Sequence, residues 1–191
     1  WNPKDLKVGD HVGLLVTPQG EGKVFVNGKE VAKVKGMPTG LPLYPVVDLL
    51  GNTVAVSFLE GAKPPTGYGL KQGAPFSEPP LPVPIPIPLP NPGRPAGAGL
   101  TGFKSGIQSS VVSISADGLT AEHRNPGGAL LQGVVFGNGQ VAIFPEGAYF
   151  EVEVRKVHSA EADGLTLGIT TVMPQSAPSQ PYETAEDVGN C

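Results

Sequence analysis

Few residues in this chain have the chemical character of a catalytic or metal-binding site, and those few are dispersed. The three histidines, His11, His123 and His158, lie far apart, and none has carboxylates at the spacing typical of a metal site. A histidine without such neighbours is more often a surface or turn residue than a ligand. We therefore expect no metal ion at any of the three.

Carboxylates and the single thiol give no stronger indication of catalysis. Asp10 and Asp48 stand alone in segments of strand character, whereas paired acid–base catalysis needs two carboxylates that converge. We expect both to accept backbone hydrogen bonds at strand ends. Cys191 is the only cysteine, and no histidine or asparagine constellation surrounds it to activate a thiolate. The sequence predicts neither an enzyme nor a cofactor site.

Glycine-containing pairs mark turns rather than phosphate loops. No strand-loop-helix pattern frames Gly127-Gly128 or Gly137-Asn138-Gly139, although a phosphate cradle requires one. Asn27-Gly28, Asp117-Gly118 and Asn138-Gly139 each lie between apolar segments, where these pairs readily supply the positive φ of a tight hairpin. Each of the last three pairs predicts a hairpin turn.

The segments around these turns have the two-residue period of half-buried strands. Apolar residues alternate with polar or small ones in Phe150–Arg155 and in Val54–Phe58. No stretch has the pattern of a long amphipathic helix, and 27 Gly and 22 Pro along the chain would make helix interiors costly. The sequence therefore predicts an all-β domain built from short antiparallel strands.

Residues 4 to 59 carry four motifs in a specific order. The motifs are Leu-x-x-Gly-Asp-x-Val-Gly within Lys4–Leu15, Phe-Val-Asn-Gly within Lys23–Val31, Tyr-x-Val-Val-Asp-Leu-x-Gly within Leu43–Gly51, and Val-x-Val-Ser within Thr53–Phe58. In order and spacing they resemble the closing half of the neuralized homology repeat (NHR), a relative of the SPRY and concanavalin-like sandwiches. The resemblance implies an antiparallel β-sandwich.

Residues 109 to 173 resemble the opening half of the same repeat. Val112–Arg124 is similar to the first hairpin of the family, and Gly133–Phe136, Tyr149–Val154 and Gly164–Thr170 are similar to its next three strands. In the family these strands precede the ones that stand at the start of this chain. The two halves are thus in swapped order.

The swapped order predicts three parts: a C-terminal half of the sandwich in residues 1–62, a Pro/Gly-rich linker in 63–108, and an N-terminal half in 109–191. The halves are either half-repeats of a tandem array or one circularly permuted sandwich, which is permissible because domain ends often lie close together. A processed chain is a third explanation. Because Trp1 stands where an initiator Met would be, we expect successive repeats, with few contacts between the halves.

Pro79–Pro90 alternates proline strictly with aliphatic residues. Proline fixes φ and lacks an N–H, so in polyproline II form this strap would span roughly 37 Å, at about 3.1 Å per residue. In an extended two-fold form, the aliphatic residues present their side chains to one face and could pair along one edge only. The strap is either a semi-rigid spacer or a docking element. As a docking element it would contact a partner through Leu81, Val83, Ile85, Ile87 and Leu89.

Composition excludes some functions and locations. A net charge of −4 with dispersed Lys and Arg argues against nucleic-acid binding, and no apolar run is long enough for a transmembrane helix. One cysteine cannot form an intrachain disulfide framework, and no Asn-x-Ser/Thr acceptor occurs. These features favour a reducing, intracellular compartment without identifying it.

The function implied by the resemblance is protein interaction, sometimes as the substrate-recognising part of a ubiquitin ligase. In a sandwich, variable loops at the strand ends concentrate the binding groups. The loop candidates are Met37 within Lys35–Thr39, His123 and Arg124 within His123–Pro126, and Tyr182 within Gln175–Tyr182. One alternative is an architectural subunit of a large multi-subunit assembly. A second, carbohydrate binding, rests on fold analogy alone.

Alternation also predicts which residues form the apolar core. They are Val24, Val26, Val47, Leu49, Val54, Val56, Val152, Val154, Leu167 and Ile169.

Overall fold

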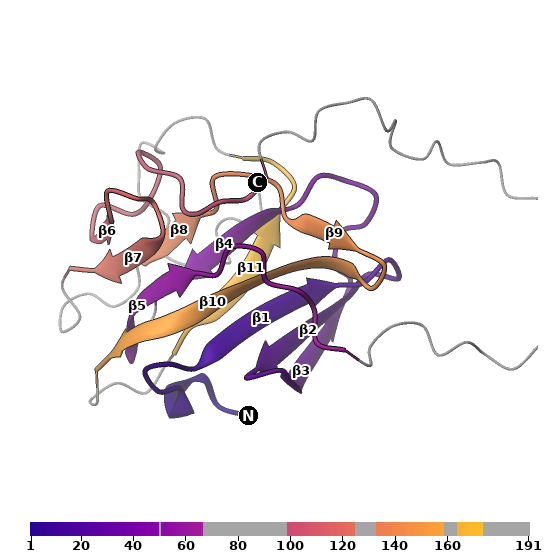
Figure 1. Cartoon of the computed structure of the whole chain (residues 1–191), viewed down its shortest axis with the longest axis horizontal. Coiled ribbons are helices and arrows are strands. Elements are labelled where there is room, and N and C mark those ends of the chain that lie inside the picture. The colour runs from indigo at the N-terminus through magenta and orange to yellow at the C-terminus, as the bar shows by residue number, and fades with distance from the viewer. Residues whose placement is uncertain (50, 67–98, 125–132, 159–163, 174–191) are drawn as a thin grey trace, which may run out of the picture.

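Two layers of antiparallel strands make up the described part of the chain (Figure 1). The computed structural model describes residues 1–49, 51–66, 99–124, 133–158 and 164–173. We call residues 1–66 the N-terminal segment and residues 99–173 the C-terminal segment. The predicted all-β antiparallel sandwich is confirmed.

Each segment supplies strands to both layers. The N-terminal segment contains the short 3-10 helix η1 (Pro3–Asp5), then β1 (His11–Val16), β2 (Glu21–Val26), β3 (Lys29–Lys35), β4 (Tyr44–Asp48) and β5 (Thr53–Phe58). The C-terminal segment contains β6 (Val112–Ile114), β7 (Thr120–His123), β8 (Val134–Phe136), β9 (Ala142–Phe144), β10 (Gly147–Val157) and β11 (Thr166–Thr170).

The strands form a large sheet and a small one. The large sheet has the order β3-β2-β1-β10-β5-β7-β6, with β9 paired to β10 beside this path. The small sheet has the order β11-β4-β8. Every pairing between these strands is antiparallel, as hairpin-rich sequences with short strands favour.

The two segments interleave within both sheets. Strand β10 lies between β1 and β5, with Val152 opposite Val12 on one side and Phe58 on the other. Strand β4 lies between β8 and β11, with Val47 opposite Val135 and Leu167. The expectation of few contacts between the halves is therefore wrong. In this structure they complete one sandwich, because neither segment has all the neighbours that its central strands need.

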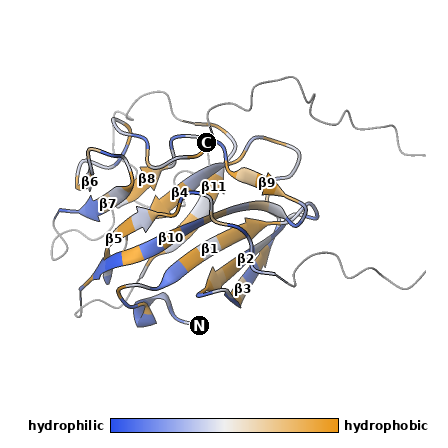
Figure 2. Cartoon of the chain, viewed as in Figure 1, coloured by the Kyte–Doolittle hydropathy of each residue, from blue (hydrophilic) through white to orange (hydrophobic). Residues whose placement is uncertain are grey.

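The main core lies between the sheets. It joins Val12 and Val56 of the N-terminal segment to Val135, Phe150 and Val152 of the C-terminal segment. The alternation that places these side chains inward is visible along β10 (Figure 2). Of the predicted core residues, Val47, Leu49, Val54, Val56, Val152 and Val154 are buried, and Val24, Val26, Leu167 and Ile169 are partly buried against the core.

Smaller clusters cover the outer faces of both sheets. On the large sheet, Leu15, Phe25 and Tyr149 are buried together, with Ala62 and Phe144 packed against them. On the small sheet, the outer cluster consists of Val46, Ile107, Val134 and Phe136. Strands β1 and β4 are consequently buried on both faces along most of their length.

Two of the three predicted hairpin turns are confirmed. Asn27 and Gly28 have φ of 50° and 77° between β2 and β3, and Gly118 has a φ of 75° between β6 and β7. The third prediction is wrong, because Asn138-Gly139 joins β8 of the small sheet to β9 of the large sheet. The Asn138 amide instead exchanges two hydrogen bonds with Thr101, at 2.9 and 3.0 Å.

Several predicted features lie outside the described residues. They are the strap Pro79–Pro90 with Leu81, Val83, Ile85, Ile87 and Leu89, the Gln175–Tyr182 segment, Gly127-Gly128 and Cys191.

Candidate functional site

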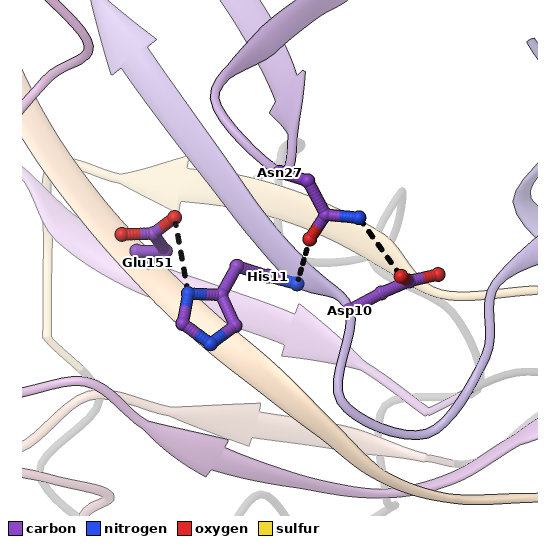
Figure 3. A network of polar contacts seen from close by, with 4 residues as sticks. All are labelled: Asp10, His11, Asn27 and Glu151. Atoms are coloured by element: carbon purple, nitrogen blue, oxygen red, sulfur yellow. Dashed lines mark hydrogen bonds and ion pairs between the residues drawn. The ribbon is translucent and has the colours of Figure 1, made fainter.

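The first candidate is a polar cluster of Asp10, His11 and Asn27, which we call the hairpin lock. It holds the hairpin of β2 and β3 against the start of β1 (Figure 3). Asn27 donates from Nδ2 to the Asp10 carboxylate at 2.9 Å, and its Oδ1 accepts from the His11 backbone N–H at 2.9 Å. The other Asp10 oxygen accepts from the Lys7 N–H at 2.8 Å. The expected role of Asp10 at a strand end is confirmed, and its carboxylate is occupied by structure.

Beside this lock, β10 contributes Glu151 to the outer face of the large sheet. Glu151 lies 4.0 Å from His11 Nδ1, and the Tyr149 hydroxyl donates a hydrogen bond to its carboxylate. Burial raises the pKa of Glu151, while the His11 charge and the Tyr149 bond act in the opposite direction. Burial and the neighbouring Glu151 charge raise the pKa of Tyr149. Tyr149 is therefore a neutral donor at physiological pH, without the character of a base.

Gly13 makes this arrangement possible. A Cβ built on Gly13 would lie 2.2 Å from the Tyr149 hydroxyl oxygen, so the ring occupies the space that any other residue would fill. The same ring makes an edge contact with Phe25, with centroids 6.4 Å apart. The last glycine of the Leu-x-x-Gly-Asp-x-Val-Gly motif is thus explained by the packing of a tyrosine from the other segment.

Two further residues considered in the sequence, His123 and Asp48, are both buried. His123 was expected at the surface, but it is 4% exposed in β7, and burial lowers its pKa. Its side chain is not accessible to a partner in this structure. Asp48 is fully buried at the end of β4. Within the described residues, no group of three or more His, Cys, Asp or Glu could hold a metal ion.

The second candidate is a groove at one end of the sandwich, with a volume of about 590 Å³. Its floor is the end of the main core, at Val16, Leu43 and Ala148. Its walls come from the β1–β2 turn, the β3–β4 loop and the approach to the β9–β10 hairpin. Both segments therefore contribute to the groove.

The walls of the groove are apolar and partly exposed. Leu41 and Ile143 line it with 56% and 76% of their surface exposed, and none of its lining residues carries a charge. Exposed aliphatic side chains beside a concave surface are typical of an interaction site rather than a core.

Backbone hydrogen bonds hold the groove in shape. The Gly20 carbonyl accepts from the N–H groups of both Gly36 and Met37 at 3.0 Å, which ties the β1–β2 turn to the β3–β4 loop. The far end of that loop is fixed where Val141 N–H donates to the Leu43 carbonyl at 2.8 Å. The groove is therefore preformed, which lowers the entropy that binding would otherwise cost.

Of the predicted loop candidates, some lie at the groove and others lie away from it. Lys35–Thr39 does reach the groove, because Pro38 and Thr39 line it, while Met37 packs inward against the core. Arg124 is exposed at the end of β7, outside the groove. Sequence patterns did not identify Leu41 or Ile143 as candidate binding residues. An isolated Leu41 between Gly40 and Pro42 was the available signal, because a loop has no folding need for an exposed leucine.

The end loops of this antiparallel sandwich thus frame a concave, uncharged surface, and loops at strand ends are where binding groups concentrate on such folds. Residues 1–60, which contain β1 to β5, match the Neuralized family model. This match confirms the resemblance drawn from the motifs of residues 4 to 59. No solved structure matches the chain. Among the described residues, no helix is long and apolar enough to cross a membrane.

Proposed function

We propose that this chain is a non-catalytic protein-interaction module of the neuralized-repeat type, and that the groove is its binding site. The observation that carries the proposal is the pair of exposed aliphatic side chains, Leu41 and Ile143, on the walls of a groove without charged residues. Burying one such side chain in a complex contributes about 1.5–3 kcal/mol before the costs of association.

The groove favours an extended, uncharged partner segment with aliphatic residues at alternate positions. Strand β9 forms one side of the site and, among the described strands, pairs only with β10, through Ala142, Ile143 and Phe144. Its other edge can receive a strand from a partner, whose alternate side chains would then lie beside Ile143. A charged segment would lose its hydration here without gaining an opposite charge.

The test is binding of a fluorescent probe peptide with alternating valine and threonine, measured by anisotropy with the whole chain. Leu41→Asp and Ile143→Asp should each weaken binding at least about tenfold, as expected for losing one buried aliphatic contact. Val172→Asp is the matched control, because Val172 is 65% exposed and does not line the groove. Equal weakening by all three variants, or no binding of the probe, contradicts the proposal.

We also propose that the strap residues Leu81, Val83, Ile85, Ile87 and Leu89 provide a second contact with protein. The support is the alternation itself, since a plain spacer has no need of an aliphatic at every second position. Changing Val83, Ile85 and Ile87 to Ser, with every proline kept, should reduce capture of a partner isolated by its binding to the whole chain. Unchanged capture by this variant would assign the strap to a spacer role.

Architectural association is the second candidate function, and the interleaving of the two segments favours it. We propose that the C-terminal segment is the opening half of a neuralized repeat, placed after the closing half in this chain. We also propose that the chain fastens larger assemblies together. Arg124, exposed beside the β6–β7 edge, is a proposed further contact.

A further inference from the structure

The interface between the N-terminal and C-terminal segments has the composition of a domain core cut in two. Each of the three aromatic ring pairs found among the described residues joins one segment to the other. Phe58 takes part in two of them, an edge contact with Phe103 at 5.9 Å and a stacked contact with Phe150 at 6.4 Å. Apolar interfaces of this kind are typical of obligate association.

At three glycines, the backbones of the two segments approach so closely that a Cβ atom would not fit between them. A Cβ on Gly133 would lie 2.3 Å from the Leu49 carbonyl oxygen, and one on Gly147 would lie 2.1 Å from that of Val16. Gly164 meets Pro3 in the same way, at 2.5 Å. Each glycine belongs to the C-terminal segment and each contacted backbone belongs to the N-terminal segment. The fit therefore depends on shape at these positions, and not on apolar area alone.

Neither segment can complete a sheet alone. Without β10, the facing edges of β1 and β5 lose their ladders, and without β4, β8 and β11 lose their common neighbour. Edges of this kind, beside an open apolar face, are templates for pairing with another chain. The chain crosses between the segments only through residues 67–98, so none of the contacts above requires that covalent connection.

We propose that the surface each segment leaves open is a docking surface for the complementary segment, and that a second copy of this chain can supply it. Exchange between two copies gives a closed dimer of two sandwiches, each with the same pairings as the single chain. Only the effective concentration of the complementary segment distinguishes the exchanged dimer from the monomer.

This exchange would place the binding groove between two copies. The groove takes Val16, Leu41 and Leu43 from the N-terminal segment, and Ile143 and Ala148 from the C-terminal segment. Each groove of an exchanged dimer would therefore be built from both chains. Association of the segments does not depend on the groove's function, so loss of groove binding would leave this proposal standing.

The test uses the whole chain with a specific protease site inserted between Gln72 and Gly73, cleaved after folding. The two pieces should remain together as a one-to-one pair by native mass spectrometry and unfold in one thermal transition. Isotopically heavy and light cleaved chains, unfolded and refolded together, should give all four pairings in equal amounts. Intact heavy and light chains refolded at high concentration should form mixed dimers that dilution and a further refolding convert to monomers.

Two glycine variants sharpen the test because they make the same chemical change. Gly133→Ala places a methyl group against the Leu49 backbone, whereas a Cβ on Gly99 has nothing within 4 Å. Gly133→Ala should raise the dissociation constant of the cleaved pair at least tenfold, and Gly99→Ala should leave it unchanged. Should Gly133→Ala fail to fold, the pairing of wild-type pieces still decides the matter.

Separation of the pieces, with either one keeping its own strand signal and thermal transition, would overturn the proposal. So would recovery of only the original pairings after refolding cleaved chains together, or the absence of mixed dimers from intact chains at every concentration. Loss of probe-peptide binding in the groove, by contrast, would leave the exchange result intact and count only against the proposed binding function.

Discussion

Replacing Gly13 by alanine should destabilise the protein, against the ordinary preference of strands. In a strand interior, glycine is normally worse than alanine by about 0.5–1 kcal/mol, because it loses more conformational freedom on folding. Gly13 is different because a Cβ would lie 2.2 Å from the Tyr149 hydroxyl oxygen and 2.7 Å from its Cζ atom. These atoms belong to a buried ring, which cannot move away as the end of a flexible side chain could.

The expected loss of stability combines two effects of displacing the Tyr149 ring. Displacing Tyr149 overpacks its cluster with Leu15 and Phe25, and overpacking typically costs about 1–3 kcal/mol. It also breaks the hydrogen bond to the partly buried Glu151 carboxylate, and a bond to a charged group contributes about 1.5–3 kcal/mol. After subtracting the gain from removing a glycine, we expect Gly13→Ala to lower the free energy of unfolding by about 2–5 kcal/mol.

Urea unfolding of single and double variants measures this effect. Gly168→Ala in β11 is the matched control, since its Cβ would meet only Val46 at an ordinary 3.8 Å. Tyr149→Leu shortens the side chain that collides, so Gly13→Ala should cost much less in the Tyr149→Leu background, and the double-mutant cycle should show a coupling. If Gly13→Ala matches the control, or if its cost is the same in both backgrounds, β1 and β10 do not pack as described.

Three further perturbations test the core, the hairpin lock and the buried histidine. Val47→Asp should lower the free energy of unfolding by about 3–5 kcal/mol, because a fully buried site would acquire an unpaired charge; a small shift in the thermal midpoint would contradict the core assignment. Asn27→Gly keeps the positive φ but loses the bonds to Asp10 and His11, so it should cost about 1–2 kcal/mol in urea unfolding. Because burial lowers the pKa of His123, the folded state binds fewer protons than the unfolded state, and stability should fall as pH drops below about 6.5, by at most about 1.4 kcal/mol per pH unit. His123→Phe should flatten that part of the pH profile, and an unchanged profile would assign the slope to other groups.

The strands and tight turns could be predicted because their determinants are local. Alternation along Phe150–Arg155 specifies which side chains face inward, and β10 buries Phe150, Val152 and Val154 accordingly. Asn27-Gly28 specifies a turn because both residues adopt positive φ there. In each case, the residues that carry the signal lie within a few positions of the structure they determine.

Pairing between distant strands could not be predicted in the same way. Nothing local in Val152 distinguishes a strand between β1 and β5 from a strand within a separate repeat. His123 was misplaced for a related reason, because β7 pairs with β5 of the N-terminal segment, and nothing local to His123 indicates that pairing. Asn138-Gly139 has hairpin chemistry, yet the strands it joins belong to different sheets.

The groove could not be predicted from the sequence, for a different physical reason. Its walls are loops, whose composition follows no period, and its floor is an end of the core that only exists once both segments have met. Pro38 fell within a segment chosen as a loop candidate, but Ile143 lies in a three-residue strand too short to show alternation. A short apolar strand between turns was the signal that could have drawn attention to it.

The motif residues hold the fold together, whereas the exposed groove residues do not. Asp10 and Asn27 are occupied by the hairpin lock, and Gly13 by the Tyr149 ring, so changing them would damage the fold before it changed any specificity. Leu41 and Ile143 have the opposite character, since their exposed side chains can change without opening the core. A scaffold divided in this way can acquire new partners through its loops while its strands stay the same. The groove nevertheless requires residues of both segments, so partner binding should weaken whenever association of the segments weakens, even with every groove side chain unchanged.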